Sequence, residues 1–274
     1  MGILYLVATP IGNLEDMSPR AIRILREASL IAAEDTRHTG QLLKHFEIHT
    51  KLTSYFEHNK LTKLDSILSA LDVGDVALVS DAGTPALNDP GYELVRAALT
   101  AGHRVSPVPG AASPISALIS SGLPTDNFLY LGYLPRKTSE RKESLEKISS
   151  LPYTLIFLET PHRLIDSLDD LQSILGDRQI AVARELTKLY EEIWRGKISE
   201  AKKYFAEPRG EFVLVVAGCS SETEAKWTDD EMESAIKSGL DVGEAPSPLA
   251  ARLAEESGWK RRDVYRLIVG NEKD

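Results

Sequence analysis

Three loops rich in proline, glycine and small side chains are candidates for holding a ligand through backbone groups. They lie at residues 9–14 (TPIGNL), at residues 80–86 with a continuation to Asp89-Pro90-Gly91, and at residues 107–113 (PVPGAAS). Glycine lets a backbone approach a ligand closely, and proline keeps such a loop stiff. Ala111, Ala112 and Ser113 then open a predicted helix, whose first amides are free donors. This chemistry suits a cofactor that carries a carboxylate, ribose hydroxyls and an adenine ring.

Four further loops carry polar side chains suited to a substrate site. They are residues 34–38 (EDTRH), 55–59 (YFEHN), 159–163 (ETPHR) and 184–191 (RELTKLYE). Acids, imidazoles, an amide, arginines and a lysine that converge on one cleft would bind a polar substrate. Taken singly, each has a structural alternative: Glu34 or Asp35 would cap the following helix or pair with Arg37. The histidines show no metal-ligand spacing, so no metal site is expected.

Two common nucleotide-binding signatures are missing from these loops. None matches the dinucleotide fingerprint G-x-G-x-x-G or the phosphate loop G-x-x-x-x-G-K-[ST]. The sequence therefore disfavours a nicotinamide enzyme and an ATPase.

The elements that position the loops follow an alternating pattern over the first 120 residues. Short apolar runs at 3–8, 30–33, 51–54, 76–79 and 104–108 predict strands, and helical patterns lie between them at 19–28, 39–46, 62–71 and 91–101. This alternation predicts an α/β domain with a largely parallel sheet. Ligands bind at the carboxyl ends of such strands, where the loops above lie. Gly74 and Gly102 are expected to end helices in the left-handed conformation.

A second block and a small tail complete the predicted organisation. Strands are expected at 128–131, 154–158, 180–183, 192–195 and 211–217, with helices at 139–148, 163–175 and 199–205. Residues 122–126 form a candidate linker, and the polar residues 219–227 a tether. Thr228 and Glu231 form a capping-box pattern before a helix at 229–237, and helices from 247 and over 260–269 flank Gly258. The predicted domains are 1–122, 123–220 and 228–274, the last resembling a helix-turn-helix.

Composition limits the functional classes. Hydrophobic residues make up 42% and charged residues 27% of 274 residues, an ordinary globular composition. No uninterrupted apolar run is long enough to span a membrane, and the N-terminus reads as a first strand, so a cytoplasmic protein is expected. The formal net charge of −9 argues against simple non-specific binding to nucleic acid, although basic clusters exist locally.

Four motifs in this order resemble one family. They are residues 4–14 (LYLVATPIGNL), 33–37 (AEDTR), 80–85 (SDAGTP) and 108–111 (VPGA). The combination resembles the bacterial 16S ribosomal RNA (cytidine-2′-O)-methyltransferases of the tetrapyrrole methylase superfamily. Relatives that methylate tetrapyrroles have a first loop of the G-x-G-P-G type. Here it reads ATPIG, which favours the RNA subgroup.

The resemblance implies a two-domain α/β fold with a small C-terminal helical domain. It also implies S-adenosylmethionine in the cleft between the α/β domains, a homodimer, and the 30S ribosomal subunit with its 16S RNA as partner. The cofactor contacts that we expect are Pro10, Gly12, Asp81, Gly83, Thr84, Pro109, Gly110, Ala111, Ser113 and Glu159.

Methylation of a ribose hydroxyl needs alignment with the methyl donor and help in removing the hydroxyl proton. Candidate bases are Glu34, Asp35 and Glu185, together with Lys188 if its surroundings lower its pKa. The residues that we expect to contact RNA are Arg37, His58, Asn59, Arg136, Lys137, Arg184, Lys260 and Arg261. Two alternatives remain: a methyltransferase that acts on a small tetrapyrrole precursor, and a non-catalytic nucleic-acid-binding protein.

Overall fold

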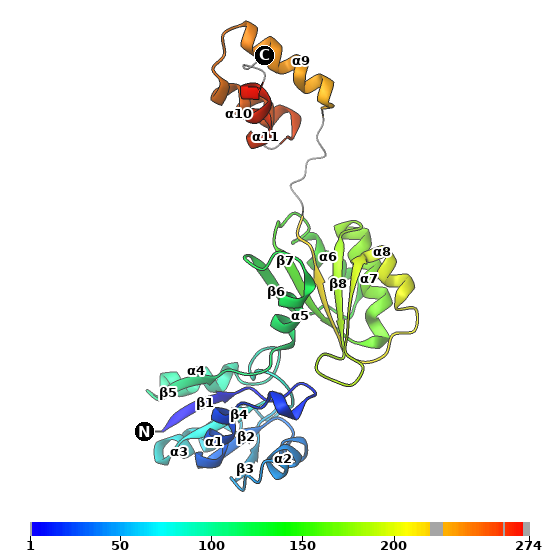
Figure 1. Ribbon diagram of the computed structural model, residues 1–274. Helices are drawn as coiled ribbons and strands as arrows, with labels where there is room; N and C mark the ends of the chain where they lie inside the picture. Colours follow the sequence, from blue (N-terminus) through cyan, green and yellow to red (C-terminus); the bar gives the residue numbers. More distant parts are fainter. Residues whose placement is uncertain (1, 220–226, 260, 271–274) are drawn as a thin grey trace. The chain divides into compact units, whose positions relative to one another are not determined.

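The computed structural model describes residues 2–219, 227–259 and 261–270. The chain divides into two compact units, residues 1–218 and 219–274 (Figure 1). The larger unit holds two five-stranded sheets, and the smaller one holds helices. Among the described residues, none of the helices is both long and apolar enough to cross a bilayer.

The first sheet is entirely parallel, as the alternating pattern predicts. Its strands are β1 (Ile3–Val7), β2 (Leu30–Ala33), β3 (Leu52–Ser54), β4 (Val76–Val79) and β5 (Arg104–Val108), in the order β3-β2-β4-β1-β5. The connecting helices are α1 (Pro19–Glu27), α2 (Thr36–His45), α3 (Leu64–Val73) and α4 (Tyr92–Thr100), with a short 3-10 helix η1 (Leu14–Asp16) after β1. All five carboxyl ends therefore meet at one edge, where the first set of loops lies.

Alternating side chains of these strands build two cores. On one face, Val7, Ile31 and Val79 pack against α1 and α2. On the other face, Leu4 and Leu78 pack with residues of α3 and α4. Because strand side chains alternate between faces, a sheet that is covered on both sides needs these nearly continuous apolar runs.

The second sheet is mixed rather than parallel. Its strands are β6 (Phe128–Tyr133), β7 (Thr154–Glu159), β8 (Gln179–Arg184), β9 (Glu192–Lys197) and β10 (Phe212–Val216), in the order β6-β7-β10-β8-β9. Its helices are α5 (Ser113–Ser121), α6 (Thr138–Glu146), α7 (Leu164–Leu175) and α8 (Ile198–Tyr204), with a 3-10 helix η2 (Pro161–Arg163). β10 is antiparallel to both of its neighbours. β7 and β8 therefore run in the same direction, and their carboxyl ends lie at one edge beside the start of β10.

Helix α5 departs from the predicted boundary at residue 122. Ala117 and Leu118 of α5 are buried against Ile156 of β7 and Val213 and Val215 of β10. The helix thus covers one face of the second sheet, and α6, α7 and α8 contribute to the core on the opposite face. Judged by packing, the division falls before Ser113, because the apolar face of α5 has its partners in the second sheet.

The smaller unit has its own core. Helices α9 (Asp229–Asp241), α10 (Pro246–Ser257) and α11 (Arg261–Gly270) bury Met232, Leu249 and Ile268 together. Thr228 and Glu231 make the reciprocal capping-box hydrogen bonds that their spacing predicts. Gly258 ends α10 with φ +76, a left-handed helix end that precedes α11. Most of the predicted tether, residues 220–226, lies outside the described residues.

Gly74 does not adopt the left-handed conformation that its position after α3 predicts. Its φ is −174, whereas Gly102 has φ +82 as expected. An added Cβ at position 74 would lie 3.0 Å from the Ser29 side chain, so a larger residue would require Ser29 to shift slightly. The backbone conformation at Gly74 is extended and does not itself require glycine.

Candidate functional site

The three proline- and glycine-rich loops meet at the carboxyl edge of the first sheet. Thr9 and Gly83 exchange backbone hydrogen bonds of 2.9 and 3.0 Å, which join the first loop to the second. The Thr84 hydroxyl donates to the Ala111 carbonyl at 3.1 Å and joins the second loop to the third. Gly110 packs so closely on Ala8 that an added Cβ would lie 2.9 Å from the Ala8 Cβ. The third loop is thereby held against the end of β1.

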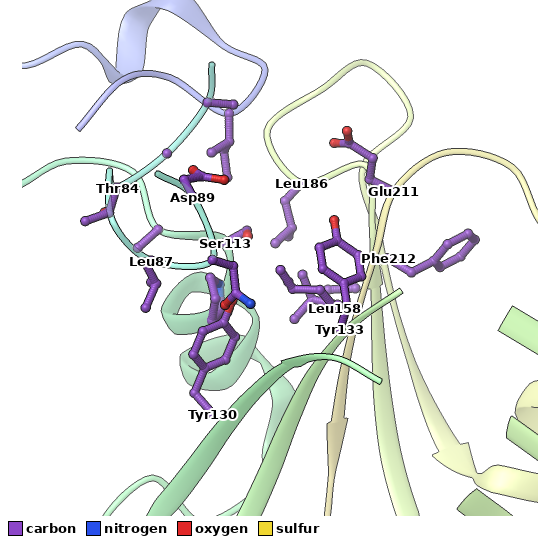
Figure 2. Close-up of a pocket in the computed structure, with 18 of the residues that line it drawn as sticks. Thr84, Leu87, Asp89, Ser113, Tyr130, Tyr133, Leu158, Leu186, Glu211 and Phe212 are labelled. Atoms are coloured by element: carbon purple, nitrogen blue, oxygen red, sulfur yellow. The ribbon is translucent and has the colours of Figure 1, made fainter. Parts of the chain in front are cut away.

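A first cavity of about 280 Å³ opens between these loops and the second sheet (Figure 2). One wall carries backbone and small side chains from residues 81–84 and 112–114. Tyr133, Leu158 and Leu186 lie across the cavity from Thr84 and Asp89, and Tyr130 lies beside Ser113 (Figure 2). Val213 also lines the cavity. Figure 2 shows the Tyr133 hydroxyl directed into this space and the Phe212 ring directed away from it.

Tyr130 and Tyr133 line the same cavity because of a β-bulge. In a regular strand, residues three apart face opposite sides. The register of β6 against β7 shifts between Tyr130 and Gly132, so that Tyr130 pairs with Ile156 and Tyr133 with Leu158. Asn88, at φ +65, fits against Gly132, where an added Cβ would lie 2.2 Å from the Asn88 amide nitrogen. The bulge thus turns both rings to one side and seats the second loop on the second sheet.

Five acidic residues line the first cavity, and Glu34, Asp81 and Asp89 are the three that follow strands of the first sheet; the others are Glu159 and Glu211. The Asp81 backbone N–H donates to Glu34 Oε2 at 3.3 Å, and the Asp35 N–H donates to Asp81 Oδ1 at 2.9 Å. Burial raises the pKa of Glu34, the hydrogen bond from Asp81 opposes the rise, and the Asp89 and Asp81 charges add to it. Burial also raises the pKa of Asp89. This wall is suited to a cationic ligand and contains a carboxylate with increased basicity.

The four candidate bases have different surroundings. Asp35 caps α2 and forms a two-point ion pair with Arg37, and these bonds hold the pKa of Asp35 well below its usual range. A hydrogen bond from the Glu211 N–H lowers the pKa of Glu185. Burial favours the neutral form of Lys188, but hydrogen bonds to Glu211 and Glu185 outweigh it and raise the pKa of Lys188.

The condition under which Lys188 was a candidate base is therefore not met. Lys188 Nζ lies 3.0 Å from Glu185 Oε1 and 2.9 Å from Glu211 Oε2, so that its charged form is stabilised. Its stem packs on Gly12, where an added Cβ would lie 2.4 Å from the Lys188 Cγ. Lys188 joins the loop after β8 to the loop after β1. Of the four candidates, only Glu34 has its pKa shifted toward the range of a general base.

A second cavity of about 500 Å³ adjoins the first. The two share Ile11, Asp81, Ala82 and Glu211 as lining residues. The second cavity is also lined by Thr9, Pro10, Gly12, Leu14 and Lys188, and by four residues of helix α2: His38, Gln41, Leu42 and His45. Residues at positions i, i+3, i+4 and i+7 share one helix face, so α2 presents a continuous wall.

The expected cofactor residues fall into three groups. Asp81, Gly83, Thr84 and Ser113 line the first cavity, and Pro10 and Gly12 line the second. Pro109, Gly110 and Ala111 lie outside both lining sets; Gly110 packs on Ala8, and the Ala111 carbonyl accepts from the Thr84 hydroxyl. Glu159 reaches the first cavity but is only 2% exposed, and its carboxylate accepts from Ser167 and the Thr160 N–H. The hydrogen bonds of Glu159 therefore explain its burial without a cofactor contact.

Within the larger unit, the expected RNA contacts are not brought together. Asn59 is used within its own turn, where it accepts from the Phe56 N–H and donates to Ser54. His58 is exposed in the same turn, away from both lining sets. Lys137 pairs with Glu140 beside the exposed Arg136, and Arg184 pairs with Glu192. Arg261 of the smaller unit donates to Ser247, and Lys260 lies outside the described residues.

Several lining residues are not among the expected site residues. Asp89 belongs to the continuation of the second loop but has no expected role, Tyr130 and Tyr133 follow no regular strand pattern, and Glu211 precedes β10. The α2 face has a readable signal, since Gln41, Leu42 and His45 have helical spacing within the predicted helix 39–46 and His38 directly precedes it. The sequence of β6 shows no such signal, because a bulge is not encoded by residue spacing.

Comparisons with known proteins agree with this architecture. A sequence model of the tetrapyrrole (corrin/porphyrin) methylases matches residues 3–202. The chain is 48% identical to "Ribosomal RNA small subunit methyltransferase I" of Synechocystis sp., over 100% of both chains. It is 47% identical to the protein of that name from Halalkalibacterium halodurans, over 97% of this chain and 94% of the relative.

Solved structures share the fold at low sequence identity. The methyltransferase CobJ superposes with a TM-score of 0.60 at 18% identity, covering 80% of this chain and 95% of that one. A uroporphyrin-III C-methyltransferase from Thermus thermophilus, in complex with S-adenosylhomocysteine, gives 0.54 at 20% identity, covering 79% and 97%. By the match over residues 3–202 and the identity over its full length, the chain belongs to the tetrapyrrole methylase family, in the group of relatives called ribosomal RNA small subunit methyltransferase I.

Proposed function

We propose that the chain transfers a methyl group from S-adenosylmethionine to the ribose 2′-hydroxyl of a cytidine in the 16S RNA of the small ribosomal subunit. The observation that carries the proposal is the full-length identity of 48% and 47% to proteins named as small-subunit ribosomal RNA methyltransferases. The site also supports the proposal, because it has one cavity that can hold the methyl donor and a second cavity that adjoins the first.

The residues of the first cavity fit S-adenosylmethionine. Its apolar and aromatic wall suits an adenine ring, and its loop wall offers backbone groups at residues 81–84 and 112–114. The donor carries a sulfonium and an ammonium, and Glu34, Asp81 and Asp89 supply negative charge on the same cavity. We therefore place the donor in the first cavity, with Gly83, Thr84 and Ser113 as backbone contacts.

S-adenosylmethionine supplies an electrophilic methyl group on sulfur. With the donor bound, the methyl carbon would pass from sulfur to the ribose 2′-oxygen, and the sulfur would keep the electron pair of the broken bond. The hydroxyl proton goes to the Glu34 carboxylate, whose pKa is raised by burial and by neighbouring acids. The Thr9–Gly83 and Thr84–Ala111 hydrogen bonds fix the three loops against one another, so that the loops would hold the donor in one position.

The direct test is methyl transfer from labelled S-adenosylmethionine to unmodified 30S subunits, with naked 16S RNA and a porphyrin precursor in parallel. We expect label in subunit RNA, at a linkage that resists alkaline cleavage. Label on the porphyrin precursor alone would favour the small-molecule alternative. Label on none of the three, despite donor binding, would leave the cofactor assignment and remove the substrate assignment.

We also propose a homodimer that works in the cytoplasm. Ile115 and Ile119 lie one turn apart on α5 and are 43% and 72% exposed, while the opposite face of α5 is buried on the second sheet. An exposed apolar stripe on a packed helix is typical of an interface. Light scattering on the wild-type chain and on Ile119→Lys tests this, with a monomeric mass expected for the variant.

A further inference from the structure

The second cavity has a position that a two-substrate reaction requires. It shares Ile11, Asp81, Ala82 and Glu211 with the first cavity, so a ligand in one borders a ligand in the other. If the first cavity holds the methyl donor, as proposed above, the acceptor must reach the shared wall from the second. The inference below rests on that proposed function and names the subsite for the acceptor.

The α2 wall of the second cavity has the chemistry of a nucleoside site. The Gln41 side chain is exposed and carries both a donor and an acceptor, which is what the hydrogen-bonding edge of an unpaired base requires. His38 and His45 add imidazole groups that suit ribose and phosphate oxygens. Leu42 and, from η1, Leu14 provide apolar surface for the flat face of a base.

The same wall does not suit a tetrapyrrole precursor that carries several carboxylates. Such a ligand needs arginine or lysine partners, and the one Lys or Arg among the residues that line the second cavity is Lys188. Its ammonium is already held by Glu185 and Glu211 at 3.0 and 2.9 Å. Asp81 and Glu211 add negative charge to the lining. The electrostatics therefore favour a neutral base over a polycarboxylate.

We propose that the second cavity is the subsite for the acceptor nucleotide, with the unpaired base lying against Leu14 and Leu42 and Gln41 hydrogen-bonding its edge. Gln41 is thus a specificity-determining residue on the α2 face. The ribose of this nucleotide lies toward Asp81 and Ala82, where the two cavities meet.

The test compares Gln41→Met with Lys44→Met. Methionine matches glutamine in length but offers no amide hydrogen bonds, and Lys44 is exposed on the same helix outside the lining of either cavity. Steady-state methylation of unmodified 30S subunits is measured for both variants and the wild type, with donor affinity by calorimetry. We expect Gln41→Met to lower kcat/KM for the subunit about tenfold. Donor affinity should not change, and Lys44→Met should resemble the wild type.

A second variant blocks the cavity without touching the amide. Leu14 is 42% exposed, so Leu14→Trp should fold and should obstruct the cavity from the η1 side. We expect loss of subunit methylation with unchanged donor affinity. Wild-type kcat/KM in both Gln41→Met and Leu14→Trp would overturn the subsite while the proposed function stands. Failure of the wild-type enzyme to methylate any RNA would overturn both.

Discussion

At the scale of single residues, Glu34 differs from the other candidate bases in its surroundings. Asp35 and Glu185 are carboxylates whose hydrogen bonds stabilise the charged form, which makes them weaker bases. Glu34 is partly desolvated and faces other carboxylates, which makes it a stronger one. Groups close in space set these differences in pKa, so Glu34 and Asp35 have different roles although they are adjacent in the sequence.

We expect Glu34→Gln to lower turnover by about 10²-fold to 10⁴-fold, the contribution of general-base catalysis. Donor affinity should fall much less than turnover, because glutamine keeps the shape and can still accept from the Asp81 N–H, while Asp81 and Asp89 keep two of the three charges that face the cationic donor. Asp35→Asn is the matched control. It should retain most of the turnover, because Asp35 caps α2 and asparagine can cap a helix equally well. Single-turnover methylation and donor calorimetry on both variants check this. Equal turnover in Glu34→Gln and the wild type would remove Glu34 from the mechanism.

The pH dependence of turnover carries a second prediction at this scale. A base must be deprotonated, so turnover should fall as the pH drops through the raised pKa of Glu34. The charge on Asp89 contributes to that rise, so Asp89→Asn should move the acid limb of the kcat profile to lower pH. If the acid limb of the kcat profile lies at the same pH in the wild type and in Asp89→Asn, a group other than Glu34 controls the fall in turnover.

At the scale of elements, the bulge in β6 determines how the two sheets share the site. It places Tyr130 and Tyr133 on one side and leaves room for Asn88 at Gly132. The positive φ angles of Ala86 and Asn88 fall in the same loop, and those of Glu185 and Thr187 in the loop after β8. Such strain in non-glycine residues concentrates where a functional geometry is held in place by its surroundings.

Gly132→Ala should destabilise the protein by about 2–4 kcal/mol, combining overpacking with the cost of φ +65 for a residue with a Cβ. It should also weaken donor binding, because Asn88 and the tyrosines line the same cavity. Gly122→Ala is the matched control, since Gly122 is left-handed with φ +81 and ψ +5 and nothing lies within 4 Å of an added Cβ. The control should cost about 1 kcal/mol. Thermal unfolding and donor calorimetry measure both effects, and equal losses would exclude the clash with Asn88.

At the level of the whole molecule, each of the two units has a hydrophobic core of its own. The core of residues 219–274 consists of residues from α9, α10 and α11. The exposed face of α11 carries Arg261, Arg262 and Arg266. A cluster of arginines on one helix is suited to RNA phosphates, even in a chain of net charge −9.

A fragment of residues 1–218 should therefore fold and bind the methyl donor with the affinity of the full chain. Its affinity for the 30S subunit should fall. The slope of the logarithm of the binding constant against the logarithm of the salt concentration should also become shallower, by the amount expected for the loss of about one to three phosphate contacts. Filter binding at several salt concentrations gives both quantities. Unchanged affinity and an unchanged slope would mean that the smaller unit makes no contact with the RNA.

Much of the fold was predictable from local patterns. The strands at 30–33, 76–79 and 104–108 were predicted with their observed bounds, and the capping box at Thr228 was read directly. Buried parallel strands are continuous apolar runs, and helix caps are local, so both leave a signal in short stretches of sequence. The meeting of the three loops at one edge follows from the same rule for parallel sheets.

Local sequence patterns are enough to predict the α/β pattern, the three loops and the resemblance to a methyltransferase family. Tertiary structure alone decided that α5 packs on the second sheet, that Lys188 is held charged by Glu185 and Glu211, and that Glu34 has the raised pKa. It also decided that the α2 face lines a second cavity. Burial and the charge of neighbours set these outcomes, and both depend on residues far apart in the chain.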